Sequence, residues 1–113
     1  MSFRKQYALV DRKREGLRMR CKYPDRVPII VEKSKGCKVT LDKHKYIVPG
    51  DLLFSQFLYV IRKRMKLSST STVFAFINNV IPNPNDTVMD VYNKHKDNDS
   101  FMYVTYCTEM AFG

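Results

Sequence analysis

Residues 41–67 read LDKHKYIVPGDLLFSQFLYVIRKRMKL, and this stretch predicts a strand followed by an amphipathic helix. The β-branched and aromatic run at 44–48 favours a strand, and the Pro-Gly pair after it breaks the chain. Apolar residues then recur at helical spacing from Leu53 to Met65. The basic residues within 62–66 suit the C-terminal end of a helix, where the helix dipole is negative. We therefore expect a helix whose apolar side packs on a sheet.

The N-terminal part predicts a second strand behind a basic helix. Residues 26–33, RVPIIVEK, are rich in β-branched side chains and should pair with the strand of the central stretch, because Gly36 supplies a reversal between them. Pro28 has no N–H to donate, so it should lie at a strand margin or where no ladder bond is required. Residues 8–22 show a broken helical period rich in Arg and Lys. We predict a helix there, and the short segment 3–7 is compatible with a further helical turn.

The C-terminal half supplies the remaining elements. We expect a strand at 73–77, a short strand near Val80–Ile81, a turn at 82–86, a helix at 87–95 and a strand at 101–106. After the N-terminal helices, the expected order of elements is β-β-α-β-β-α-β. This order predicts an α+β roll in which a helix covers one face of the sheet. Short connections, the absence of repeats and the length of 113 residues indicate a single domain.

Several function classes find no support in the residues. The three cysteines show no CxxC spacing, and no signal-like apolar segment opens the chain, so we expect a cytoplasmic protein. The longest apolar run, at 73–77, is far below the roughly 18 residues of a membrane-spanning helix, so membrane contact should be peripheral or covalent. His44 and His95 lie in no Cys or carboxylate cluster with metal-ligand spacing, and no nucleophile motif is present. We predict no metal, no cofactor and no enzyme activity.

The charge is strongly uneven along the chain. Residues 1–66 carry 18 Lys and Arg against 6 Asp and Glu, whereas residues 67–113 carry 2 against 5. A positive face of this kind attracts nucleic acid, anionic lipid or acidic peptides without choosing among them. A basic nucleic-acid-binding module therefore stays an alternative, although no RNP-type motif or zinc-finger spacing supports specific binding.

Three runs and the C-terminus carry a resemblance to a known family. They are KYPDRVPIIVEK at 22–33, the stretch 41–67, NNVIPN at 78–83, and the final Phe112-Gly113. Together they resemble the autophagy ubiquitin-like modifiers, the GABARAP-type family that is conjugated to lipid. The resemblance implies a ubiquitin-like β-grasp fold, with a mixed four- to five-stranded sheet and a crossing helix, preceded by two N-terminal helices.

The resemblance also implies a division of the chain and a life cycle. Residues 1–22 would be a helical extension, 23–106 the β-grasp domain and 107–113 a flexible conjugation tail. Gly113 would be passed as a thioester between activating-like and conjugating-like enzymes and joined to phosphatidylethanolamine on the autophagosomal membrane. A processing and deconjugating cysteine protease would act at the same glycine, which lacks a Cβ and so can enter a narrow enzyme cleft. Attachment to protein lysines is the alternative. We assign no function to residues 1–8.

Docking of short linear motifs is the second implied activity. Aromatic-x-x-aliphatic motifs of cargo receptors and autophagy adaptors would add a strand at the edge 45–48. By matching positions, the pocket for the aromatic anchor comprises Glu15, Met19, Pro28, Ile30, Lys45, Ile47 and Phe101. The pocket for the aliphatic anchor comprises Tyr46, Val48, Pro49, Leu52, Phe57 and Val60. Cations that would meet acidic residues of the motif are Arg26, Lys43, Lys45 and Arg64.

Overall fold

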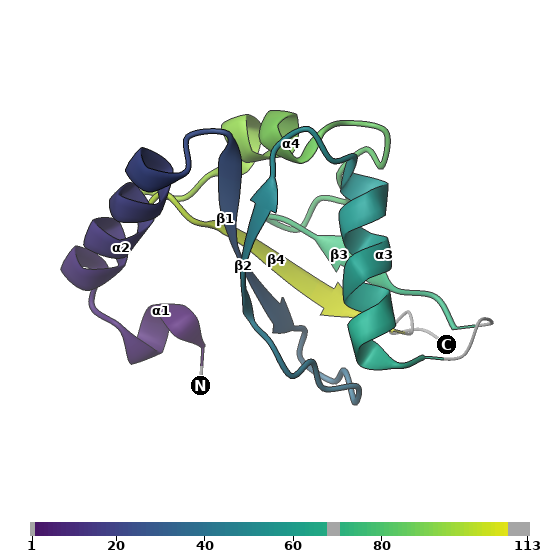
Figure 1. The fold of residues 1–113 in the computed structure, drawn as a ribbon. Coiled ribbons are helices and arrows are strands. Elements are labelled where there is room, and N and C mark those ends of the chain that lie inside the picture. The colour runs from purple at the N-terminus through teal and green to yellow at the C-terminus, as the bar shows by residue number, and fades with distance from the viewer. Residues whose placement is uncertain (1, 68–70, 109–113) are drawn as a thin grey trace.

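The computed structural model describes residues 2–67 and 71–108. Its elements, coloured along the chain in Figure 1, are α1 (Phe3–Gln6), α2 (Leu9–Lys22), β1 (Arg26–Lys33), β2 (Lys45–Pro49), α3 (Phe54–Met65), β3 (Phe74–Phe76), α4 (Val88–His95) and β4 (Met102–Cys107). The strands form one sheet in the order β2-β1-β4-β3. Strands β1 and β4 run parallel in its centre, while β2 and β3 pair antiparallel at the two edges. This is the mixed sheet that the family resemblance implied.

The main core lies on the face of the sheet covered by α3 and α4 (Figure 1). Strand β1 points Val27, Ile29 and Val31 into it, as the period of two along a strand requires. Helix α3 contributes Phe57 and Ile61, one turn apart, which are 0% and 1% exposed. The predicted helix therefore packs its apolar side on the sheet, as the spacing from the central stretch indicated.

Helices α1 and α2 cover the opposite face (Figure 1). Met19 of α2, Ile30 of β1 and Phe101 are buried but are not part of the main core cluster. Gly16 allows α2 to approach closely, because a methyl group there would overlap the carbonyl oxygen of Asp99. The N-terminal helices are thus packed on the domain through a second, smaller apolar layer.

One predicted strand does not form. Between Ile77 and Val80 the chain makes a two-residue turn, with each of these residues donating its N–H to the other's carbonyl, 2.8 and 3.0 Å. Asn78 and Asn79 both have positive φ, 52° and 64°, which suits the mirror-image turns of hairpins. Pairing stops at this bridge between Ile77 and Val80, so the expected short strand near Val80–Ile81 is wrong, and these two side chains are 52% and 59% exposed.

The other element bounds agree with expectation within a few residues. Strand β4 runs one residue past the predicted end, because Cys107 pairs with Phe74 of β3. Pro28 precedes Ile29, the first residue of β1 that pairs with β4, so its missing N–H lies where that ladder has not begun. This confirms the position expected for a proline in a strand.

Candidate functional site

Strand β2 is an edge strand with an open side. Val31 donates its N–H to the carbonyl of His44, 2.7 Å, which sets the phase of the antiparallel ladder between β1 and β2. Because hydrogen-bonded and non-bonded pairs alternate, Tyr46 and Val48 turn their backbone groups toward β1. The N–H and C=O of Ile47 therefore face outward, at the edge that no described strand covers.

Side chains of β2 alternate between the two faces of the sheet. Ile47 pairs with Pro28 and Lys45 pairs with Ile30, which places these four residues on the α2 side. Tyr46, in contrast, belongs to the main core on the α3 side. The two predicted pockets thus lie on opposite faces of one strand.

The predicted aromatic-anchor residues gather on the α2 side, but with unequal exposure. Met19, Ile30 and Phe101 are 8%, 0% and 0% exposed, so they form the buried floor of this side. Glu15 reaches from α2 to the strand, where Lys45 Nζ lies 2.8 Å from its Oε1. Their ion pair bridges the gap between helix and edge strand.

A hollow of about 680 Å³ opens beside this ion pair. Its lining residues are Phe3, Gln6, Tyr7, Asp11, Arg12, Glu15, Lys43, His44 and Lys45. Only two of the predicted pocket residues, Glu15 and Lys45, line it. Sequence reasoning missed the contribution of α1, although the two aromatic side chains Phe3 and Tyr7, four residues apart, were a signal that one side of this helical turn packs on the domain.

Glu15 keeps its negative charge over a wide pH range. A bidentate contact from Arg18, with distances of 3.1 and 3.0 Å, and the contact from Lys45 lower the pKa of Glu15 to about 2. The positive charge of Lys45 at the edge strand is accordingly already matched by a carboxylate of the same chain.

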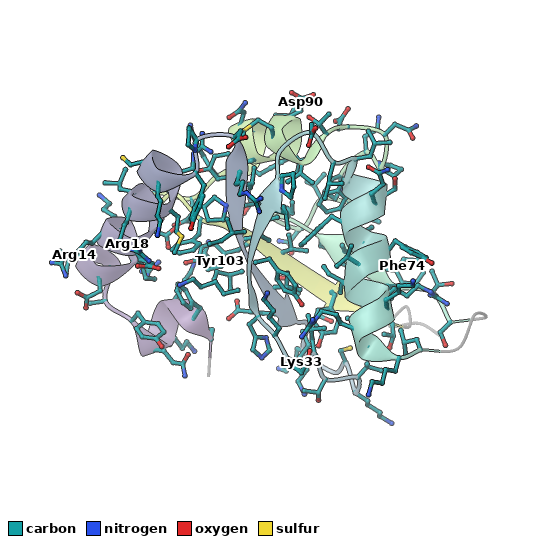
Figure 2. All side chains as sticks on the ribbon, in the orientation of Figure 1. Arg14, Arg18, Lys33, Phe74, Asp90 and Tyr103 are labelled. Atoms are coloured by element: carbon teal, nitrogen blue, oxygen red, sulfur yellow. The ribbon has the colours of Figure 1, made fainter. Side chains whose placement is uncertain are left out.

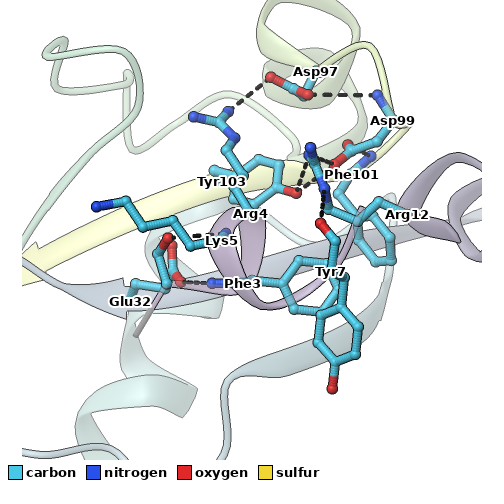
Figure 3. A network of polar contacts seen from close by, with 11 residues as sticks. Phe3, Arg4, Lys5, Tyr7, Arg12, Glu32, Asp97, Asp99, Phe101 and Tyr103 are labelled. Carbon is cyan, nitrogen blue, oxygen red and sulfur yellow. Dashed lines mark hydrogen bonds and ion pairs between the residues drawn. The ribbon is translucent and has the colours of Figure 1, made fainter. Parts of the chain in front are cut away.

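Helix α1 is fastened by contacts to three distant segments (Figure 3). The backbone N–H of Phe3 donates to Glu32 Oε2, 2.7 Å, and its ring packs edge-on against Phe101 with centroids 5.4 Å apart. Arg4 pairs with Asp97, 2.7 Å, and its guanidinium lies 4.0 Å from the ring centroid of Tyr103. These contacts hold α1 as one wall of the hollow.

Asp99 is the buried centre of the same network (Figure 3). Its side chain is 0% exposed and accepts hydrogen bonds from Arg12, at 2.8 Å, and from the hydroxyl of Tyr103. Burial, followed by the hydrogen bond to Asp99, raises the pKa of Tyr103, so this hydroxyl stays a donor. The hydrogen bond that Arg12 donates to the Tyr103 hydroxyl, 3.4 Å, is the largest cause that raises the pKa of Arg12. The network ties α2 to β4.

The predicted aliphatic-anchor residues lie on the α3 side. Tyr46 and Phe57 pack edge-to-face, with ring centroids 5.7 Å apart, and both are buried. Phe57 can therefore serve only as a floor. Val48 and Leu52 are half-buried against the core, while Val60 is 43% exposed. Pro49, at the end of β2, is exposed.

The four predicted cations differ in what they contact. Arg26 and Lys43 are exposed, and Lys43 Nζ lies 5.1 Å from the ring centroid of Tyr46. Lys45 pairs with Glu15, as described above. Arg64 makes a bidentate pair with Asp42, with Nε–Oδ1 at 3.2 Å and Nη2–Oδ2 at 3.1 Å. Two of the four cations are thus held by carboxylates of this chain.

Other predicted features are answered only within the described residues. Gly113 lies outside them. In the ranges 2–67 and 71–108, no group of three or more His, Cys, Asp or Glu side chains is arranged to hold a metal ion. No helix in the same ranges combines the length and apolar character needed to cross a bilayer. Cys21 is exposed, whereas Cys37 and Cys107 are partly buried.

The arrangement matches known proteins in sequence and in structure. Residues 11–113 match the family model described as "Autophagy protein Atg8 ubiquitin like". The chain belongs to the Atg8 family of ubiquitin-like autophagy proteins. It is 50% identical over 103 residues to Autophagy-related protein 8e of Arabidopsis thaliana, covering 90% of this chain and 84% of that protein. It is 44% identical over 113 residues to Autophagy-related protein 8 of Mycosarcoma maydis, covering 99% and 96%.

The structural match among Atg8 proteins is equally broad. The crystal structure of Trypanosoma brucei ATG8 superimposes with a TM-score of 0.91 at 34% identity, covering all of this chain and 98% of the other. The ubiquitin-like β-grasp fold with two N-terminal helices is thereby confirmed. Membership of the Atg8 family makes this chain an autophagy protein that takes part in interactions of that process.

Proposed function

We propose that this Atg8 protein is a modifier rather than an enzyme. It is conjugated through Gly113 to phosphatidylethanolamine and docks aromatic-x-x-aliphatic motifs of cargo receptors and adaptors on the autophagosomal membrane. The observation that carries the docking proposal is the open edge of β2, where the apolar side chains of Ile47 and Val48 are partly exposed on opposite faces of the sheet.

The spacing of the motif fits this edge for a geometric reason. Successive side chains of an extended peptide point to opposite faces, so residues three apart point to opposite faces as well. An added strand would therefore send its aromatic anchor toward Ile47 on the α2 side and its aliphatic anchor toward Val48 on the α3 side. A motif with two or four residues between anchors matches this alternation, while one with three does not.

The docking proposal is tested by removing the outward N–H of the edge strand. Ile47→Pro removes this donor, which β1 does not use, and proline is tolerated in edge strands. Ile47→Ala is the matched control, because it loses the side chain but keeps the N–H. We expect Ile47→Pro to bind an aromatic-x-x-aliphatic peptide about five- to tenfold more weakly than Ile47→Ala in calorimetry, the loss that corresponds to one hydrogen bond. Equal binding by the two variants contradicts strand addition.

The conjugation half is tested on the protein isolated from starved cells. Mass spectrometry with and without phospholipase treatment identifies what is bonded to the carboxylate of Gly113. A phosphatidylethanolamine adduct that is absent in Gly113→Ala supports the proposal. An amide to a protein lysine supports the alternative modifier, and a persistently free glycine refutes conjugation while leaving peptide docking in place.

The nucleic-acid alternative predicts a different response to salt. Binding through several phosphate contacts falls steeply between 50 and 200 mM salt, by about 10³ or more. Docking of an apolar motif loses only its charge-assisted part. RNA binding at 50 mM salt that falls in this way by 200 mM, together with no peptide binding at either salt concentration, would favour the alternative.

A further inference from the structure

Four residues near the start of β2 form a charged cluster on the α3 side, which we call the Arg64 cluster: Asp42, Lys43, Tyr46 and Arg64. Arg64 stands one turn after Val60 on α3, so it borders the predicted aliphatic pocket. Its guanidinium meets both carboxylate oxygens of Asp42, and the side chains are 40% and 70% exposed respectively. This bidentate geometry is also the one in which arginine binds a carboxylate of a partner molecule.

Tyr46 brings a buried hydroxyl into this cluster. The residue is 4% exposed, and Arg64 acts on its hydroxyl through its charge and a side-chain hydrogen bond. Burial raises the pKa of Tyr46, and these two effects of Arg64 oppose the rise only in part, so the hydroxyl keeps its proton. Arg64 therefore lies against the Tyr46 hydroxyl as well as against the carboxylate of Asp42.

The faces of β2 indicate which residue of a docked peptide meets the cluster. The predicted aromatic pocket is centred on Lys45 and Ile47, whereas the aliphatic pocket lies further along, at Val48 and Leu52. A motif with its aromatic residue first therefore runs in the direction of β2. The residue directly after the aromatic anchor then points to the α3 side, at the level of Tyr46 and beside Arg64.

We propose that Asp42 pairs with Arg64 where a ligand carboxylate would otherwise bind, and that an acidic residue directly after the aromatic anchor of a docked peptide displaces Asp42 from Arg64. This inference rests on the proposed docking function. Each new pair between Arg64 and a peptide carboxylate requires the loss of the pair with Asp42, so the two contributions largely cancel. Asp42 thereby limits how strongly the site prefers an acidic residue at that position.

The test compares two peptides that differ only in the residue after the aromatic anchor, Glu in one and Gln in the other. Their dissociation constants are measured by calorimetry, and the ratio of the Gln value to the Glu value reports the acidic preference. Wild-type protein should show a ratio below about two. Asp42→Asn should raise this ratio about two- to fivefold, the range for an exposed ion pair. Arg64→Gln should bring it to one, with or without Asp42→Asn.

A matched control separates displacement from a general change in charge. Asp90→Asn removes the same charge from an exposed residue of α4, drawn at the top of Figure 2 and well separated from α3's C-terminal end. It should leave the ratio unchanged, and a rise equal to that of Asp42→Asn would overturn the proposal. An unchanged ratio in Asp42→Asn would overturn it as well. If neither peptide binds wild-type protein, the docking function itself fails, which is a distinguishable result.

Discussion

Gly16→Ala sets two opposing effects of known size against each other. In the interior of a helix alanine is about 1 kcal/mol more favourable than glycine, so α2 taken alone predicts a gain in stability. In the structure, however, the added methyl group would overlap the Asp99 carbonyl oxygen and lie 3.1 Å from the Cβ of Ser100. The obstacle is backbone, which cannot rotate away as a long side chain can. Overpacking of this kind costs about 1–3 kcal/mol, and more where the network at Asp99 is also disturbed.

The net expectation is a loss of about 1–2 kcal/mol in the free energy of unfolding. For a domain of this size that corresponds to a fall in Tm of roughly 4–12 °C, measured by circular dichroism or calorimetry. Lys13→Ala is the control, because Lys13 is exposed on the same helix and should change stability by less than about 0.5 kcal/mol. A Tm equal to or above wild type in Gly16→Ala would show that α2 does not approach the Asp99 segment as described.

Two further predictions concern charges on α2. Arg12→Leu leaves the fully buried Asp99 without its cation and should lower the free energy of unfolding by about 3 kcal/mol, measured by chemical denaturation. Arg14→Leu breaks only the exposed pair with Asp11 and should lower it by less than about 0.5 kcal/mol. Equal losses in the two variants would contradict the network around Asp99. The lowered pKa of Glu15 means that its contribution is fully present above its ordinary value of 4.5 and is lost as the pH falls toward about 2. The Tm difference between wild type and Glu15→Gln should therefore be largest above pH 5 and vanish near pH 2, and a pH-independent difference would refute this assignment.

The strands and helices were predictable where a local pattern carries the information. The apolar spacing of the central stretch indicated α3, and Thr87, whose hydroxyl accepts from the N–H of Asp90, caps α4 where the helix was expected to begin. The strand near Val80–Ile81 failed for a local reason too. Asn78 and Asn79 adopt positive φ and close a tight turn, after which Val80 pairs with Ile77 as an isolated bridge and no described strand continues through Ile81. Asparagine pairs between apolar runs are a hairpin signal that outweighed the β-propensity.

For the candidate site, the side of the sheet on which each residue lies was predictable, but the residues that line the hollow were not. Residue alternation along β2 places the predicted aromatic and aliphatic residues on opposite sides of the sheet, as strand geometry requires. The hollow beside Lys45, by contrast, depends on contacts between Phe3 and Phe101, which are separated by most of the chain. No local period reports such a contact. The pairing of Arg64 with Asp42 is equally non-local, since it joins a helix end to the loop before β2.

The contacts that position α2 determine how changes in this helix should affect binding at the edge of β2. The position of α2 is set by the close approach of Gly16 and the ion pair of Arg12, both made to Asp99. Glu15, between these two residues in the sequence, carries that position to Lys45 at the edge strand. Disturbing α2 should therefore weaken contacts with an aromatic anchor. Arg64 and Asp42 lie on the other face, and Lys43 is the one residue of the Arg64 cluster that also lines the hollow, so the acidic preference set by Arg64 should survive such a change. The contacts with the aromatic anchor and the contacts with the acidic residue are thus energetically separable. A docked motif would bind along β2 and so make both sets of contacts at once.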